Sequence, residues 1–64
     1  MVETCAVLVP LLYTKDDLPE GIDPNESHNL VETAFNTGWR VRFHSIFEHK
    51  NVVYERYIFE REVK

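Results

Sequence analysis

The chain has 64 residues and a formal charge of −4, which allows one domain at most. Chains of this size bury only about 60% of the surface that their unfolded form exposes, so the core is small and self-association is a common supplement. The single cysteine, Cys5, excludes an intrachain disulfide.

Residues 3–14 predict a β-strand, because the segment is rich in valine, leucine and tyrosine. Both alternating sets of side chains are apolar, and a strand of this kind needs cover on both faces. Pro10 cannot donate a hydrogen bond to a neighbouring strand, which indicates an edge position or a bulge.

An acidic loop over residues 15–23 precedes a helix predicted over about residues 24–37. Asp23 has the side chain of an N-cap, and Pro24 suits the first helical position. Gly38 is the residue expected to end the helix in a left-handed conformation. One apolar stripe runs along the predicted helix, formed by Leu30, Val31, Ala34 and Phe35.

An aromatic hairpin is predicted over about residues 39–62, with its turn at residues 48–51. In the first strand, alternation predicts one face with Trp39, Val41, Phe43, Ser45 and Phe47, and another with Arg40, Arg42, His44, Ile46 and Glu48. In the last strand it predicts one face with Val53, Tyr57 and Phe59, and another with Val52, Tyr54, Arg56, Ile58 and Glu60.

Two registers of this hairpin are possible, and they differ in the length of the loop. A five-residue loop over residues 48–52 pairs Val41 with Phe59, Phe43 with Tyr57, Phe47 with Val53, Arg40 with Glu60, and Ile46 with Tyr54. A two-residue turn at His49 and Lys50 instead pairs Val41 with Ile58 and Phe43 with Arg56. We favour the longer loop because it keeps the aromatic side chains together.

Together these elements predict an α+β fold with the order β-α-β-β, a single domain over residues 1–64. The helix is expected to cover the sheet face of Trp39, Val41, Phe43 and Phe47. The other face then keeps an apolar patch, which usually marks an association surface, so we expect a homo-oligomer. Its candidate interface residues are Leu8, Leu12, Ile46 and Ile58.

The stretch Asn36-Thr37-Gly38-Trp39-Arg40-Val41, with Tyr57-Ile58-Phe59-Glu60-Arg61-Glu62 near the end, resembles a family of short bacterial and phage domains of unknown function. That family shows a helix ending in Asn-x-x-Gly-Trp and a last strand ending in aromatic-x-Lys-Arg. The resemblance spans about residues 3–62 and implies the same fold. Arg40 replaces the family's usual acid, and the loop before the helix is long. The family has no agreed activity, so the resemblance implies none.

Residue spacing gives little support to a metal or catalytic site. Four residues have side chains that could ligate a metal: Cys5, His28, His44 and His49. None of them shows the paired spacing of a preformed metal site. Cys5 lies in an apolar strand, and Ser45 beside His44 points to the opposite strand face. We therefore expect no catalytic residues, no cofactor and no enzymatic activity.

Two charged clusters are candidates for binding, since residues 1–38 carry a net charge of −6 and residues 39–64 a net charge of +2. The acidic cluster would bind a basic protein surface and comprises Asp16, Asp17, Glu20, Asp23 and Glu26. The other would bind a nucleotide or single-stranded nucleic acid through arginines beside an aromatic ring. It comprises Arg40, Arg42, His44, Tyr54 and Arg56. Solvated surface charge and cross-strand pairing are the alternative explanations.

The expected function is that of a small, non-enzymatic binding protein that inhibits or modulates a host protein. The size and the resemblance suggest a phage-encoded inhibitor of a bacterial defence nuclease. Two alternatives remain, an oligomer that sequesters a nucleotide-type ligand and a small nucleic-acid-binding regulator. No signal peptide is visible and the apolar run at 5–13 is too short for a membrane span, so we expect a cytoplasmic protein.

Overall fold

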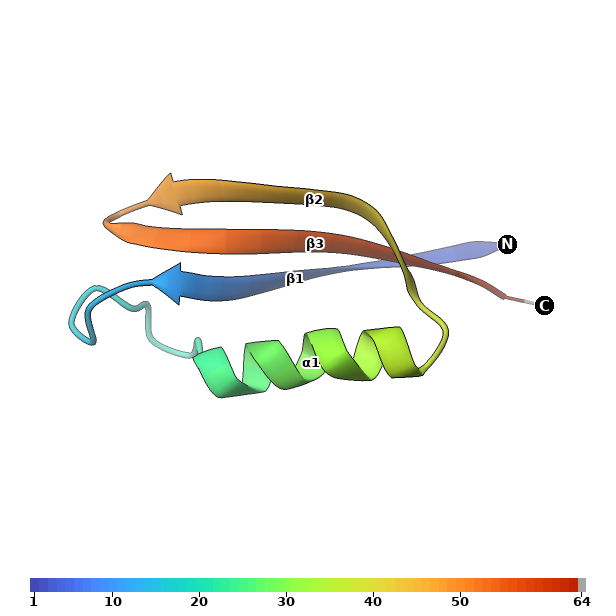
Figure 1. The fold of residues 1–64 in the computed structure, drawn as a ribbon, viewed down its shortest axis with the longest axis horizontal. Helices are drawn as coiled ribbons and strands as arrows, with labels where there is room; N and C mark the ends of the chain where they lie inside the picture. Colours follow the sequence, from blue (N-terminus) through green and yellow to red (C-terminus); the bar gives the residue numbers. More distant parts are fainter. Residues whose placement is uncertain (64) are drawn as a thin grey trace.

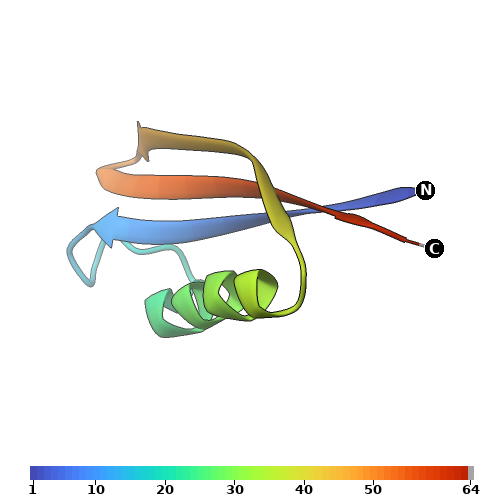
Figure 2. The same cartoon turned by 45° about the vertical axis from the view of Figure 1, so that its right-hand side comes forward.

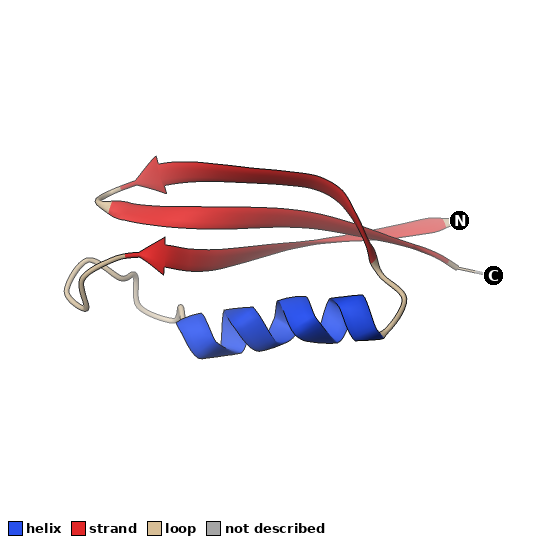
Figure 3. Ribbon diagram, in the orientation of Figure 1, coloured by secondary structure: helices blue, strands red, loops and turns tan. Residues whose placement is uncertain are grey.

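The structure is a computed structural model that describes residues 1–63; Lys64 lies outside the described residues. Its elements are strand β1 (Val2–Leu12), helix α1 (Pro24–Asn36), strand β2 (Arg40–His49) and strand β3 (Val52–Glu62). The predicted α+β fold is confirmed, with one three-stranded antiparallel sheet and one helix (Figures 1 and 3).

The strand order is β1-β3-β2, so the last strand of the chain lies at the centre of the sheet. β3 is antiparallel to both neighbours, and β1 and β2 form the two edges. Helix α1 contacts β1 and lies beside it in both views (Figures 1 and 2). The helix therefore covers the β1 side of the sheet and leaves the β2 side open.

Pro10 lies in an edge strand and next to an irregularity, as the sequence predicts. The pairing of β1 with β3 shifts between Pro10 and Leu12, where one extra residue is accommodated. Proline is tolerated at such a place because its missing N–H is not needed by a neighbouring strand.

Both predicted ends of helix α1 are confirmed. The Asp23 side chain accepts a hydrogen bond from the backbone N–H of Asn25 at 3.0 Å, and Pro24 occupies the first turn. At the other end, Gly38 has φ +87°, a conformation in which a Cβ is unfavourable. The N–H of Trp39 donates to the carbonyl of Ala34 at 3.1 Å, which ties the start of β2 to the end of the helix.

The core is small and lies between α1, β1 and β3. Its buried members are Val9, Val31, Ala34 and Phe59, and Cys5, Val7, Trp39 and Tyr57 lie around them. Phe35 meets Tyr57 and Phe59 edge to face, at ring-centroid distances of 6.5 and 5.5 Å. The only helix in residues 1–63 is too short and too polar to cross a membrane.

The predicted register of the hairpin is wrong over most of its length. The turn has two residues, Lys50 and Asn51, both with positive φ, and the pair His49–Val52 closes it. Positive φ at both central positions is typical of a type I′ turn, and the backbone twist of this turn matches the twist of the flanking strands. Neither predicted turn is correct, because the five-residue loop is too long and the turn at 49–50 begins one residue too early.

A β-bulge in β2 reconciles this turn with the other end of the hairpin. Val41 lies opposite Phe59 and Arg40 opposite Glu60, as the longer loop predicts, but Phe43 lies opposite Ile58. The register shifts between Val41 and Phe43, so Arg42 is the extra residue.

The bulge exchanges the faces of the remaining β2 side chains. His44 and Ile46 share the helix-covered face, and Phe43, Ser45 and Phe47 lie on the opposite face. We call the face without the helix the open face. The prediction that the helix covers Phe43 and Phe47 is therefore wrong, and the prediction that Ile46 shares a face with Tyr54 and Ile58 is wrong for the same reason.

Candidate interaction surfaces

Arg56 lies between two phenylalanine rings on the open face. Its guanidinium carbon is 5.8 Å from the ring centre of Phe43 and 5.4 Å from that of Phe47. Phe47 in turn stacks on Tyr54 at 5.4 Å. We call these four residues the arginine–aromatic patch. Phe43 is 51% exposed, and residues 1–63 place no carboxylate oxygen within 4 Å of Arg56.

The structure does not bring the predicted basic cluster together on one face. Tyr54 and Arg56 belong to the open face, but His44 lies on the covered face, opposite Tyr57. Arg40 is held by Glu60, with a nitrogen–oxygen distance of 3.5 Å, and Arg42 is the bulged residue. A continuous basic face of the kind that follows a single-stranded nucleic acid is therefore absent from residues 1–63.

His44 forms a polar network with Glu55 and Tyr57 instead. Its Nε2 lies 2.7 Å from one oxygen of Glu55, and the Tyr57 hydroxyl donates to the other oxygen at 2.8 Å. Burial raises the pKa of Glu55, but the hydrogen bonds from Tyr57 and His44 and the charge of His44 outweigh it, so this pKa lies below its usual value of 4.5. Burial and the bond to Glu55 raise the pKa of Tyr57.

The five residues of the predicted acidic cluster are exposed. Two of them have local structural roles, since Asp23 caps α1 and Asp17 accepts a hydrogen bond from the Thr14 hydroxyl at 2.8 Å. The side chains of Asp16, Glu20 and Glu26 are exposed and form no hydrogen bond or ion pair with residues 1–63. In that described part, no three metal-ligating side chains lie together.

The four predicted interface residues do not form one patch. Leu8 and Ile58 lie on the open face, Ile46 lies on the covered face, and Leu12 is opposite Val53 beyond the β1 irregularity. Ile46 is 60% exposed, however, because α1 does not extend over β2. The apolar surface is thus divided between the two faces near the β2 edge and the outer edge of β1.

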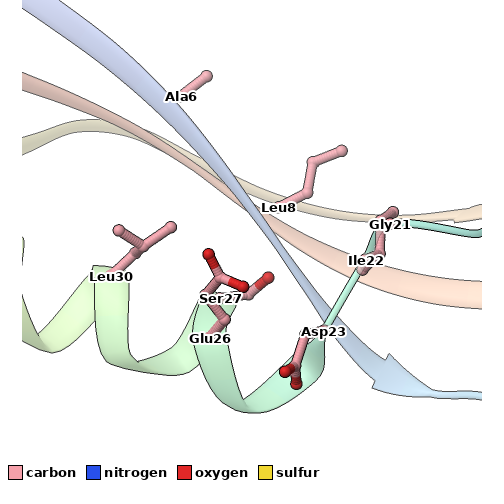
Figure 4. A pocket seen from close by; sticks show the side chains of 8 residues that line it. All are labelled: Ala6, Leu8, Gly21, Ile22, Asp23, Glu26, Ser27 and Leu30. Carbon is pink, nitrogen blue, oxygen red and sulfur yellow. The ribbon is translucent and has the colours of Figure 1, made fainter.

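A groove of 340 Å³ separates the outer edge of β1 from the N-terminal half of α1. Ala6 and Leu8 come from the strand, and Leu30, Ser27 and Glu26 come from the helix (Figure 4). The remaining lining residues are Gly21, Ile22 and Asp23. No sequence pattern indicates this groove, because it depends on where the helix lies beside the strand.

Alternation along β2 also fails to predict the arginine–aromatic patch, because it places Phe43 and Phe47 on the face that the helix covers. Strict alternation along β2 cannot locate a bulge. Asn51 was the available signal, since asparagine tolerates positive φ and suits the second position of a two-residue turn.

Comparisons of the chain with protein-family models, with curated proteins and with solved structures find no match. The resemblance to short bacterial and phage domains thus stays a prediction.

Proposed function

We propose that this chain is a non-enzymatic binding protein that inhibits or modulates another protein. The observation that carries the proposal is the balance of apolar side chains. Among the described residues, six hydrophobic side chains are buried, whereas eleven large hydrophobic side chains are exposed. One of them, Phe43, lies with Phe47 against Arg56 on the open face. An exposed apolar cluster with a polar rim is typical of proteins that act through association.

We assign the arginine–aromatic patch to the partner through its exposed members, Phe43 and Arg56. Tyr54 is buried and supports the ring of Phe47. Aromatic and arginine side chains are enriched at the energetic centres of protein interfaces, where they pack into desolvated pockets of the partner. Phe43 offers half of its surface to solvent, and the guanidinium of Arg56 has no carboxylate from residues 1–63. A partner with an apolar surface and a carboxylate would match both features.

Affinity capture tests this assignment, with the chain immobilised and the proteins that it retains identified. A partner recovered in stoichiometric amount by the unmodified chain should be lost with Arg56→Glu, and retained with Glu20→Gln in the exposed loop. Equal capture by the unmodified chain and by Arg56→Glu would remove the patch from the interface. Failure to recover any stoichiometric partner from bacterial lysates would count against the function itself.

A nucleotide-type ligand is the second candidate, and the position of Arg56 between two aromatic rings favours it. A base could stack on the exposed ring of Phe43 while the guanidinium binds a phosphate. Calorimetric titration with ATP, GTP and cyclic dinucleotides checks this. Heat that disappears with Arg56→Ala supports it, and flat traces from the unmodified chain exclude it.

A further inference from the structure

The outer edge of β2 is a strand edge that neither the sheet nor the helix covers. Within residues 1–63, β2 pairs only with β3, and α1 lies beside the opposite edge strand, β1 (Figures 1 and 2). β1 also carries Pro10 and an irregular register, which make its edge a poor template. We propose that β2 pairs antiparallel with β2 of a second copy, around a two-fold axis at Ser45, to form a six-stranded sheet.

The turn determines which β2 residues can take part. The pair that closes a two-residue turn, His49–Val52, is a hydrogen-bonded pair, and such pairs alternate along an antiparallel ladder. The odd-numbered residues from 43 to 49 therefore direct their N–H and C=O groups to β3. Residues 44, 46 and 48 direct theirs to the free edge. A two-fold partner strand must match this phase, which allows an axis at a residue but none between two residues. An axis near the middle of β2, at residue 44, 45 or 46, pairs the largest part of the strand with its copy.

Side-chain complementarity selects the axis at Ser45. It places Arg42 opposite Glu48 of the second copy and Phe43 opposite Phe47, and symmetry makes each pair twice. An axis at Ile46 would place Arg42 opposite Lys50, and the two positive charges would repel each other. An axis at His44 would place Arg42 opposite Ile46 and separate Phe43 from Phe47. Opposite charges and aromatic pairs stabilise neighbouring strands, and directly opposed like charges destabilise them.

Ser45 itself gives an independent reason for this axis. Its hydroxyl oxygen is the one buried side-chain polar atom in residues 1–63 that lacks a hydrogen-bond partner. On the axis, Ser45 would face its own copy in a non-hydrogen-bonded pair, where Cα atoms approach to about 4.5 Å. A rotation about χ1 then brings the two hydroxyls together, and the unpaired group gains a partner.

The dimer deepens the proposed function, because it doubles the binding surface. A two-fold axis perpendicular to the sheet keeps both helices on one face and both open faces on the other. The two arginine–aromatic patches then meet across the axis, through the pairs of Phe43 with Phe47. The role of this doubled surface in partner binding rests on the proposed function, whereas the pairing of the β2 edges does not.

Sedimentation equilibrium of charge-reversal variants tests the register. The unmodified chain should sediment as twice 7.6 kDa at tens of micromolar. Arg42→Glu and Glu48→Arg, each alone, place like charges opposite one another twice and should weaken dimerisation about tenfold at low salt. The double variant should restore it. A monomeric unmodified chain, or single variants that dimerise as well as the unmodified chain, would overturn the proposal.

A disulfide provides a second test that does not depend on charge. In a Cys5→Ala background, Ser45→Cys should form an intermolecular disulfide in air, since the paired Cα atoms lie within disulfide range. The matched control is His49→Cys at the exposed end of β2, whose copies would lie far apart on opposite sides of the axis. Equal cross-linking of both variants would exclude this register. A monomer that still captures its partner overturns the dimer alone, and a dimer that captures none overturns the proposed function alone.

Discussion

Single residues determine how the helix is joined to the sheet. Gly38 has φ +87°, and a Cβ built there would meet nothing within 4 Å. The requirement for glycine therefore comes from the backbone conformation and not from crowding. Side chains disfavour this region because Cβ approaches the following carbonyl oxygen.

The substitution Gly38→Ala should lower the free energy of unfolding by about 1–2 kcal/mol. Urea denaturation followed by the fluorescence of Trp39 measures the change. Gly38→Asn is the matched control and should lose less, because asparagine tolerates the left-handed region. An alanine variant as stable as the unmodified chain would contradict the conformational explanation.

Glu55 gives the molecule a pH dependence that also belongs to single residues. Its pKa lies below 4.5 because hydrogen bonds from Tyr57 and His44 outweigh the effect of burial. The unfolded chain thus binds a proton at Glu55 more readily than the folded chain, and stability is lost as the pH falls through and below 4.5.

The substitution Glu55→Gln should reduce the loss of stability between pH 5 and pH 3, as compared with the unmodified chain. The loss should begin near pH 4.5, the usual pKa of the carboxyl group. The raised pKa of Tyr57 acts at the alkaline end, where stability is lost as the pH rises above 10. Thermal unfolding at a series of pH values gives both profiles. The control is Glu62→Gln at the exposed end of β3; if it changes the acid profile as much as Glu55→Gln, the network is not the cause.

At the scale of elements, the hairpin combines two local preferences that disagree by one residue. The turn at Lys50 and Asn51 pairs His49 with Val52, whereas the helix-to-strand junction pairs Val41 with Phe59. The bulge at Arg42 absorbs the difference. The same bulge moves Phe43 and Phe47 to the open face, so an irregularity of the backbone creates the arginine–aromatic patch.

Replacing Lys50-Asn51 by Asn-Gly should stabilise the hairpin by about 0.5–1 kcal/mol, because this pair adopts positive φ at both positions most readily. The midpoint of thermal unfolding measures the gain. The reversed order, Lys50→Gly with Asn51 retained, should give a smaller increase. A loss of stability with Asn-Gly would contradict a two-residue turn at these positions.

At the scale of the whole molecule, stability depends on a very small core. Phe59 and Val52 are the largest fully buried side chains among the described residues, and Phe59 contacts the helix through Phe35. A domain of this size has a stability of about 3–5 kcal/mol from its core. Loss of one large core side chain is comparable with that total.

Phe59→Ala should therefore leave the chain largely unfolded at 25 °C, since the cost of such a substitution is about 3–5 kcal/mol. Near-ultraviolet circular dichroism of Trp39 and the tyrosines shows whether tertiary structure remains. Phe35→Ala is the control, because this ring is 53% exposed and its loss should leave a folded chain. A folded Phe59→Ala variant would place the stabilising contacts elsewhere, with the dimer interface as the first alternative.

The helix and the strands can be predicted from the amino-acid sequence, because their signals are local. The N-cap at Asp23, the glycine at 38 and the apolar stripe of the helix depend on neighbours within four residues. The alternation of Trp39 and Val41 with Arg40 likewise predicts the start of β2 correctly.

The surfaces that these elements present depend on contacts between distant parts of the chain. The position of α1 beside β1 leaves β2 uncovered, and the bulge at Arg42 decides that Phe43 faces solvent and His44 faces Glu55. Both depend on pairing between segments distant in the chain, and a one-residue change in pairing exchanges the faces of a strand. For that reason the predicted basic cluster was divided, and Phe43, Phe47 and Arg56 were brought together.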